Sequence, residues 1–173
     1  TIQNVTVSGA ADGDQRVGGV AGNISAGGVV TESTAAVSTN GTQAIGGLVG
    51  TSTGDVNSSS ASGNVTADGS QVGGLVGVHT GEQAITNSAA TGDVQGGGDS
   101  VGGLLGETDA SVRDSSANGT VSTTGDGVGG LIGTHDPSQS ATIANVSASG
   151  AVSTAGQYVG GLIGDSGANA GEI

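Results

Sequence analysis

The sequence Val-Gly-Gly-Leu-Val-Gly at residues 72–77 is the element on which the chain is built, because close copies of it recur through the whole chain. The six copies are VGGVAG (17–22), IGGLVG (45–50), VGGLVG (72–77), VGGLLG (101–106), VGGLIG (128–133) and VGGLIG (159–164). Their first residues are 28, 27, 29, 27 and 31 positions apart. A repeat of this length is typically one supersecondary unit that is stacked many times.

A second block precedes the glycine block and reads approximately I-x-N-S-x-A-x-G-x-V. Its clear instances are IQNVTVSGAA (2–11), VNSSSASGNV (56–65), ITNSAATGDV (85–94), VRDSSANGTV (112–121) and IANVSASGAV (143–152). In the second repeat, VVTESTAAV (29–37) is shorter than the pattern, so its register stays open. We therefore expect a single repeat domain over 1–173, with coils at approximately 2–29, 30–55, 56–84, 85–111, 112–142 and 143–173.

The composition favours β-structure without an ordinary globular core. The chain has 38 glycines, one tyrosine and no phenylalanine, tryptophan, methionine or cysteine. Such a composition often indicates disorder, but here valine, isoleucine and leucine recur in phase and can stack into one core. Helices are disfavoured because glycine costs about 1 kcal/mol per helical position. Three short apolar runs per repeat, separated by turn residues, predict an all-β fold, a three-sided β-solenoid of about six coils.

Stacking the coils at roughly 4.8 Å gives a rod roughly 29 Å long, with ladders of equivalent side chains inside. The first run predicts an inward ladder of Ile2, Val56, Ile85, Val112 and Ile143, followed by Val7, Ala61, Ala90, Ala117 and Ala148. The second run predicts a ladder of Val37, Val65, Val94, Val121 and Val152. The third run predicts a ladder of Val17, Ile45, Val72, Val101, Val128 and Val159.

The paired glycines leave two positions open for the leucine that follows them. Strict alternation from Val72 would send Leu75 outward, whereas a bulge at Gly73-Gly74 would turn Leu75 into the core. Glycine permits the positive φ that such a bulge needs. The equivalent leucines of successive coils form one stripe. On the outside of the solenoid, this leucine stripe would be an apolar surface for a neighbouring molecule. We expect it in the core, with the members Leu48, Leu75, Leu104, Leu131 and Leu162.

The glycine block resembles the GLUG-motif repeat family, named for glycine, leucine, any residue, glycine. The matching tetrapeptides are GLVG (47–50 and 74–77), GLLG (103–106) and GLIG (130–133 and 161–164), with GVAG (19–22) as a variant. This family occurs in large bacterial and archaeal surface proteins, adhesins and the non-catalytic regions of some secreted peptidases. The resemblance implies an extracellular, elongated module and transfers no catalytic residue.

The charge excludes two classes of partner. Fifteen acidic residues against two basic ones, Arg16 and Arg113, give a net charge of −13. Nucleic acid and an anionic membrane surface would both be repelled. An acidic chain without lysine suits a high-salt habitat and a haloarchaeal source, because dense counterions screen the self-repulsion. No apolar run is long enough to span a bilayer, so we expect no membrane insertion.

Asparagine placement adds a hint about location. Seven of nine asparagines begin an N-x-S/T sequon, namely Asn4, Asn23, Asn40, Asn57, Asn64, Asn118 and Asn145. Glycosylation of these residues would place the chain outside the cell. Repeat inheritance is the alternative account, since Asn4, Asn87 and Asn145 share one column where stacked side chains can bond along a turn.

Catalytic, cofactor and metal sites are not expected. The turns ADGDQ (11–15), ADGSQ (67–71), GGGDS (96–100) and TTGDG (123–127) each supply too few carboxylates for Ca²⁺. His79 and His135 share one column but lie two coils, or roughly 9.6 Å, apart, which is too far to share zinc. Two arginines and no lysine also argue against a polysaccharide-cleaving enzyme.

An ice-binding solenoid is a further alternative, because such proteins present a flat face of repeated threonines. The position after the second-run valine reads Ser38, Thr66, Gln95, Ser122 and Ser153, which is too mixed for such a lattice. This column therefore disfavours ice binding.

The two ends of the repeat pattern suggest association. Ile2 opens the first ladder, and Ile173 falls nine residues after Gly164, where the first ladder position of a seventh coil would lie. An uncovered terminal coil presents unpaired backbone groups that template further strands. We therefore expect the chain to be its own partner in a head-to-tail extracellular filament, with a stalk segment of a large surface adhesin as the alternative.

Overall fold

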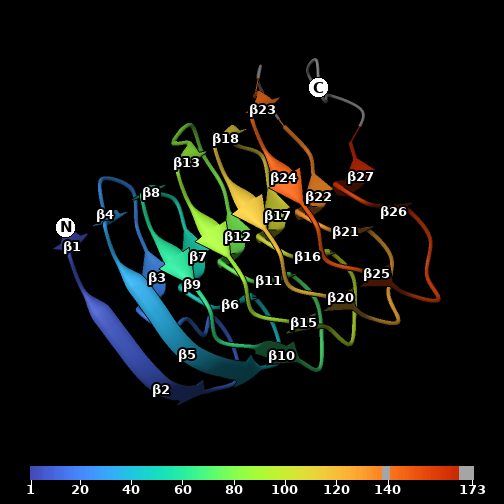
Figure 1. Ribbon diagram of the computed structural model, residues 1–173, viewed down its shortest axis with the longest axis horizontal. Helices are drawn as coiled ribbons and strands as arrows, with labels where there is room; N and C mark the ends of the chain where they lie inside the picture. The colour runs from blue at the N-terminus through green and yellow to red at the C-terminus, as the bar shows by residue number, and fades with distance from the viewer. Residues whose placement is uncertain (138–140, 168–173) are drawn as a thin grey trace.

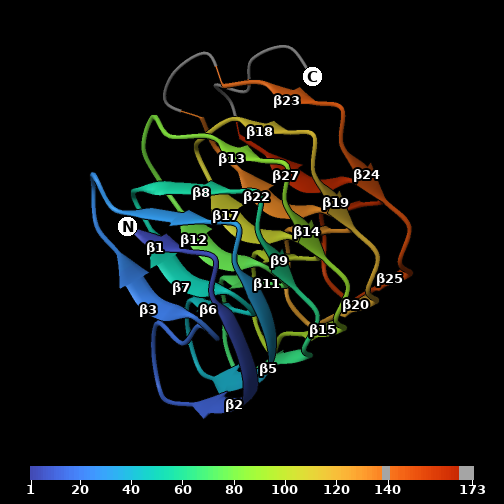
Figure 2. The same ribbon diagram turned by 60° about the vertical axis from the view of Figure 1, so that its left-hand side comes forward.

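The computed structural model describes residues 1–137 and 141–167, and every element in them is a β-strand. Successive turns of the chain lie side by side, from the first coil at one end of the molecule to the last at the other (Figures 1 and 2). All strand pairs are parallel and join residues one repeat apart. This arrangement confirms the predicted β-solenoid. Within these residues, no helix has the length and apolarity needed to cross a membrane.

The strands form four parallel sheets along the solenoid. The first sheet contains β1 (Ile2–Gln3), β4 (Val29–Thr31), β8 (Asp55–Asn57), β13 (Ile85–Thr86), β18 (Val112–Arg113) and β23 (Ile143–Ala144). The second contains β2 (Thr6–Asp12), β5 (Thr34–Gly41), β9 (Ser60–Ala61), β14 (Ala89–Ala90), β19 (Ser116–Ala117), β24 (Ser147–Ala148), β10 (Val65–Ala67), β15 (Val94–Gln95), β20 (Val121–Ser122) and β25 (Val152–Ser153).

The other two sheets are built from the glycine blocks. The third contains β6 (Ile45–Gly46), β11 (Val72–Gly73), β16 (Val101–Gly102), β21 (Val128–Gly129) and β26 (Val159–Gly160). The fourth contains β3 (Ala21–Ile24), β7 (Val49–Ser52), β12 (Val76–His79), β17 (Leu105–Thr108), β22 (Ile132–His135) and β27 (Ile163–Ser166). Five of the six glycine blocks thus contribute to two sheets and turn the chain between them. The first block contributes β3 and meets the third sheet only through an isolated bridge between Gly18 and Gly46.

The predicted inward ladders of the first and third runs are confirmed. Val56, Ile85 and Val112 are fully buried, and their strands pair in the expected register. The second repeat, whose register was open, places Val30 opposite Ile2 and Ala35 opposite Val7. Ladder members in the end coils are less covered: Ile2 is half-buried and Val159 is 52% exposed.

The prediction for Val37 is wrong. Thr39, and not Val37, lies opposite Val65 in the second-run ladder, and Ala11 continues that ladder in the first coil. The physical reason is that β5 runs unbroken through the corner, with Ala35, Val37 and Thr39 all facing inward. The solvent-facing column beside this ladder consequently contains Asn40 in place of Ser38.

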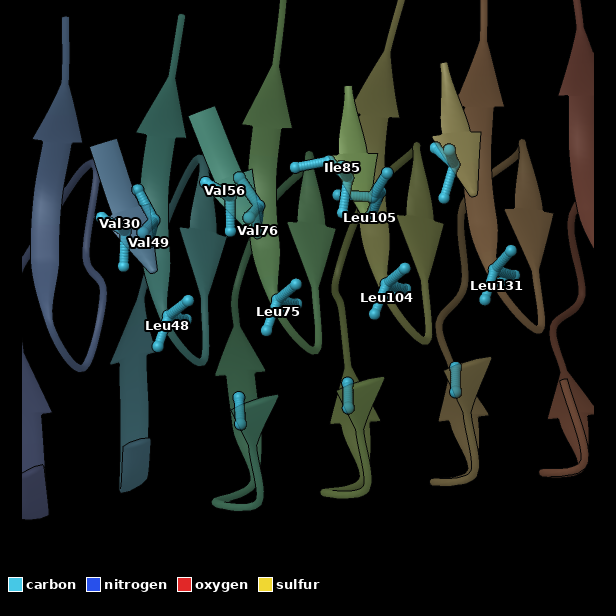
Figure 3. Packing of buried hydrophobic residues seen from close by; sticks show 14 of the residues in the cluster. Val30, Leu48, Val49, Val56, Leu75, Val76, Ile85, Leu104, Leu105 and Leu131 are labelled. Atoms are coloured by element: carbon cyan, nitrogen blue, oxygen red, sulfur yellow. The ribbon is translucent and has the colours of Figure 1, made fainter. Parts of the chain in front are cut away.

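The expected burial of the leucine stripe is confirmed. Leu48, Leu75, Leu104 and Leu131 are fully buried and lie in one row in Figure 3. Val49, Val76 and Leu105, which follow three of these leucines, are also fully buried (Figure 3). The chain bends so that two consecutive side chains enter the core, which strict alternation would forbid.

The expected cause of this bend is wrong in one respect. Gly73 and Gly74 do not have positive φ; the positive φ lies just ahead of the block, at Gln71, with a φ of 65°. The glycines are instead required by close approach. A Cβ on Gly73 would overlap the Val76 carbonyl oxygen, and a Cβ on Gly74 would overlap the Gly103 carbonyl oxygen of the next coil.

Candidate functional site

The second glycine of the block lets adjacent coils interlock. A Cβ on Gly103 would overlap the carbonyl oxygen of Gly130 and lie 2.9 Å from the Ala117 Cβ across the core. The same relation joins Gly74 to Gly103 and Ala90. The ladders of glycine and alanine therefore set the distance between the two facing walls of each coil. Gly161 in the last coil is different, because an added Cβ there would meet nothing within 4 Å among the described residues.

Two columns of left-handed residues turn the chain at fixed corners. The first contains Asn4, Glu32, Ser58, Asn87, Asp114 and Asn145, with φ between 48° and 55°. The second contains Arg16, Ala44, Gln71, Ser100, Gly127 and Tyr158, with φ between 55° and 67°. Asparagine and aspartate tolerate this conformation better than most residues, so Asn4, Asn87 and Asn145 have a structural reason for their shared column.

A buried serine ladder runs through the four central coils. Ser33, Ser59, Ser88 and Ser115 each donate their hydroxyl to the carbonyl oxygen two residues earlier, at 2.7–2.8 Å. Each hydroxyl oxygen also accepts the backbone N–H of the equivalent residue in the preceding coil, at 3.1–3.3 Å. In the end coils the equivalent residues are Val5 and Val146.

The acidic turns use their side chains to cap the next coil. Asp99 Oδ1 accepts the Asp126 N–H at 2.8 Å, and Asp126 Oδ1 accepts the Gln157 N–H at 2.6 Å. Asp93 Oδ1 accepts both the hydroxyl and the N–H of Thr120. These two bonds lower the pKa of the Asp93 carboxyl, and the bond from the Thr120 hydroxyl has the larger effect. The aspartates at these corners thus have a structural role.

The predicted histidine column is confirmed. Thr108 of β17 pairs with His79 on one side and His135 on the other, so one coil separates the two rings. His79 is completely buried; its Nε2 lies 2.7 Å from the Gln83 carbonyl oxygen, and its Nδ1 has no hydrogen-bond partner in the described chain. Burial lowers the pKa of both histidines, against the opposing effects of nearby backbone and of Asp109. The column is therefore an interior one and not a shared zinc site.

Six of the seven sequon asparagines lie on the surface. Asn4, Asn23, Asn40, Asn64, Asn118 and Asn145 are exposed, and Asn57 is half-buried. The Asn57 Oδ1 accepts the Thr31 hydroxyl at 2.6 Å, and the Asn64 Oδ1 accepts the Asp93 N–H at 3.1 Å. Of the two residues expected at the ends, Ile2 lies in β1, whereas Ile173 lies outside the described residues.

Two shallow hollows lie on the side of the solenoid. One, of about 220 Å³, is lined by Gln43, Gln71 and Thr51 among others; the second, of about 270 Å³, is lined by Asp126, Thr134, Tyr158 and their neighbours. Some of the lining side chains bond to each other: Gln43 Nε2 donates to Gln71 Oε1 at 3.2 Å, and the Ser100 and Thr134 hydroxyls are hydrogen-bonded at 2.8 Å. Within 1–137 and 141–167, no three histidines or carboxylates gather as metal ligands would.

These features define a class: a parallel β-solenoid whose side chains are used to join one coil to the next. Residues 68–95 and 97–122 match the family model described as "The GLUG motif", which confirms the resemblance over these two repeats. The chain is also similar to a protein called Halomucin from Haloquadratum walsbyi (strain DSM 16790 / HBSQ001), at 56% identity over 87 residues. The match covers 50% of this chain and 1% of that relative. No solved structure matches the chain.

Proposed function

We propose that this chain is a structural solenoid of an extracellular surface protein, and that its coils continue head to tail into a filament. The observation that carries the proposal is the continuity of the core: one apolar cluster extends from Ile24 in the first coil to Ile143 in the last. Its ladders reach both end faces, where Val20 and Leu162 are only partly buried. A further coil on either face would bury these side chains.

The surface location rests on two supports. The similarity to Halomucin and the match to the GLUG motif support a cell-surface or secreted location. The exposed sequon asparagines are consistent with glycans on that surface. Intact mass spectrometry of the native material tests this part. We expect masses above that of the bare polypeptide, with the additions mapped to exposed sequons; a mass equal to the bare polypeptide would exclude glycosylation.

Electron microscopy in the native salt tests the filament. We expect fibres with an axial rise of roughly 29 Å per subunit, because six coils stack at roughly 4.8 Å each. Dispersed monomers at every concentration would contradict filament formation. They would leave the solenoid and its surface location intact.

A stalk segment in a much longer chain is the second candidate. The comparison with Halomucin favours this candidate, since the chain spans about 1% of the length of that protein. In a stalk, the next coil belongs to the same polypeptide and not to a second molecule. Peptide mapping of the native protein distinguishes the two, because a stalk yields peptides that extend the sequence beyond residues 1 and 173.

Ice binding is disfavoured by the observed register. The outward column beside the second-run ladder contains Asp12, Asn40, Thr66, Gln95, Ser122 and Ser153, so it has a single threonine. Thermal hysteresis measured at millimolar protein would revive this alternative.

A further inference from the structure

The corner after β19 places an asparagine directly ahead of a glycine that cannot be replaced. A Cβ on Gly119 would overlap the Gly92 carbonyl oxygen of the preceding coil, and the same contact recurs from Gly92 to Gly63 and from Gly150 to Gly119. The coil therefore requires glycine at this corner. The residue ahead of the glycine varies from coil to coil and is Ser62, Thr91, Asn118 or Ser149. Of these four coils, one combines asparagine with the required glycine.

The peptide group that joins Asn118 to Gly119 is not held by hydrogen bonds. Among the described residues, the Asn118 carbonyl oxygen accepts no N–H, and the Gly119 N–H has no acceptor. The Asn118 N–H, by contrast, donates to the Ala90 carbonyl oxygen at 2.9 Å. Rotation of this peptide group about the bond between Cα and the carbonyl carbon of Asn118 therefore breaks no hydrogen bond of its own.

The side-chain amide of Asn118 is exposed and polarised. The Ser149 hydroxyl donates to Asn118 Oδ1 at 3.1 Å, and both side chains are exposed to water. A donor on Oδ1 stabilises the negative charge that develops there when a nucleophile attacks Cγ. The next backbone nitrogen along the chain, that of Gly119, can close a five-membered ring on Cγ, and an intramolecular attack of this kind is strongly favoured over the bimolecular one.

The second asparagine–glycine pair of the sequence, Asn40–Gly41, is held in place by the fold. Both residues lie in β5, which is paired with β2 on one side and β10 on the other. The Asn40 carbonyl oxygen accepts the Gly13 N–H at 3.1 Å, and the Gly41 carbonyl oxygen accepts the Asp68 N–H at 3.0 Å. Ring closure at Asn40 would break the bond from Gly13, so the two pairs have the same sequence but different freedom to react.

From these observations we infer that Asn118 is a site of spontaneous covalent modification, in which the Gly119 nitrogen attacks Asn118 Cγ. The new bond between nitrogen and Cγ closes a succinimide ring. The proton of the Gly119 N–H passes through water to the side-chain nitrogen, which leaves as ammonia. Water then opens the ring: attack at Cγ gives aspartate, and attack at the backbone carbonyl carbon gives isoaspartate. A glycan on Asn118 would retain the leaving nitrogen, so the reaction belongs to molecules without a glycan at this sequon.

The modification changes the corner in two ways, and it goes beyond the proposed filament. Both products add a negative charge to a chain whose net charge is −13. Isoaspartate also routes the backbone through Cβ and Cγ, which adds one carbon between Ala117 and Gly119. Gly119 already lies against the Gly92 carbonyl oxygen, so the longer backbone should loosen the stacking of this corner on the preceding coil.

Peptide mapping by mass spectrometry tests the inference on the whole chain, produced in a host that attaches no sugar to asparagine. During incubation of the folded chain at mildly alkaline pH, we expect the mass change from amide to acid, with isoaspartate, at Asn118 and not at Asn40. In the chain unfolded in guanidinium chloride, both asparagines should react at similar rates, because both precede glycine. Equal rates at the two residues in the folded chain would overturn the inference, and so would an Asn118 that reacts only after unfolding.

Ser149→Ala tests the polarising hydroxyl. Because Ser149 is exposed, the variant should fold like the original protein, and we expect Asn118 to react about fivefold more slowly from loss of one hydrogen bond. Ser62→Ala is the matched control, since Ser62 is an exposed serine at the equivalent position two coils before Ser149's neighbour Asn118, and it should leave the rate at Asn118 unchanged. An unchanged rate in Ser149→Ala, or equal slowing by both variants, would refute the role of the Ser149 hydroxyl.

Discussion

At the scale of single residues, glycine is the most constrained member of the repeat, because the carbonyl group of a neighbouring coil occupies the space that a side chain would need. Gly103→Ala places a methyl group against the Gly130 carbonyl oxygen and the Ala117 Cβ. We expect destabilisation by about 3 kcal/mol, as for overpacked cores. Chemical denaturation measures this change.

The matched variant Gly161→Ala should be nearly neutral, within about 0.5 kcal/mol, because nothing in the described molecule contacts the new methyl group. Equal costs for the two variants would show that the effect of glycine on the unfolded chain, and not crowding in the folded coil, dominates.

The buried His79 makes stability depend on pH. Its folded-state pKa is lowered, first by burial, against the Gln83 carbonyl, Asp109 and Asp55. The unfolded chain therefore binds a proton first, and the free energy of unfolding falls as the pH drops below about 6.5. Above that pH this contribution is constant.

His79→Thr is the appropriate variant, because Thr108 occupies the same interior column. We expect its Tm to fall less than that of the original protein between pH 8 and pH 5, as measured by calorimetry. The carboxylates and His135 are common to both proteins and cancel in the comparison. Identical pH dependence would show that His79 is not titrating in this range.

At the scale of the elements, short strands are joined by side-chain ladders as well as by backbone pairing. Ser88→Ala removes a hydroxyl that bonds the Thr86 carbonyl oxygen and leaves the buried Ser59 N–H without an acceptor. We expect a loss of about 1–3 kcal/mol in the free energy of unfolding. Ser122→Ala, at an exposed position of β20, should change it by less than about 0.5 kcal/mol. An unchanged free energy of unfolding in Ser88→Ala would show that a water molecule takes the place of the serine hydroxyl.

The strand ladders could be predicted from the sequence because identical spacing forces equivalent residues into one column. Val37 was misplaced because the second repeat has a valine where later coils have glycine, and only the unbroken strand β5 shows which residue continues the ladder. The left-handed corners were missed because Gln71, Ala44 and Tyr158 are not residues that favour positive φ. The coil, and not local preference, imposes their conformation.

The serine ladder could have been found from its motif. In four of the six coils, a serine lies three residues after the first inward valine or isoleucine and two residues before the inward alanine. Its role required the structure, since only the stacked coils show that its oxygen accepts an N–H from the preceding repeat.

At the scale of the whole molecule, electrostatic self-repulsion is the contribution to folding stability that the surroundings can change most. A net charge of −13 on a chain of 15.9 kDa opposes folding through self-repulsion, and added salt screens it. We expect the Tm to rise by about 5 °C or more between 0.1 and 3 M NaCl. The triple variant Asp12→Asn, Asp14→Asn, Asp68→Asn removes three exposed carboxylates and should show a smaller rise. An equal rise of Tm in the two proteins would show that salt strengthens the burial of apolar side chains and does not act by screening charge.

The strands cross the long axis of the molecule while the hydrogen bonds between coils run along it (Figure 1). A pulling force applied to the two chain ends therefore loads one coil boundary at a time, as in opening a zipper. Each coil of about 28 residues that detaches lengthens the chain by roughly 90 Å, because extended residues span about 3.4 Å each. Under tension such a solenoid yields stepwise at low force and becomes a long tether without breaking, and it recoils by re-adding coils onto the intact remainder.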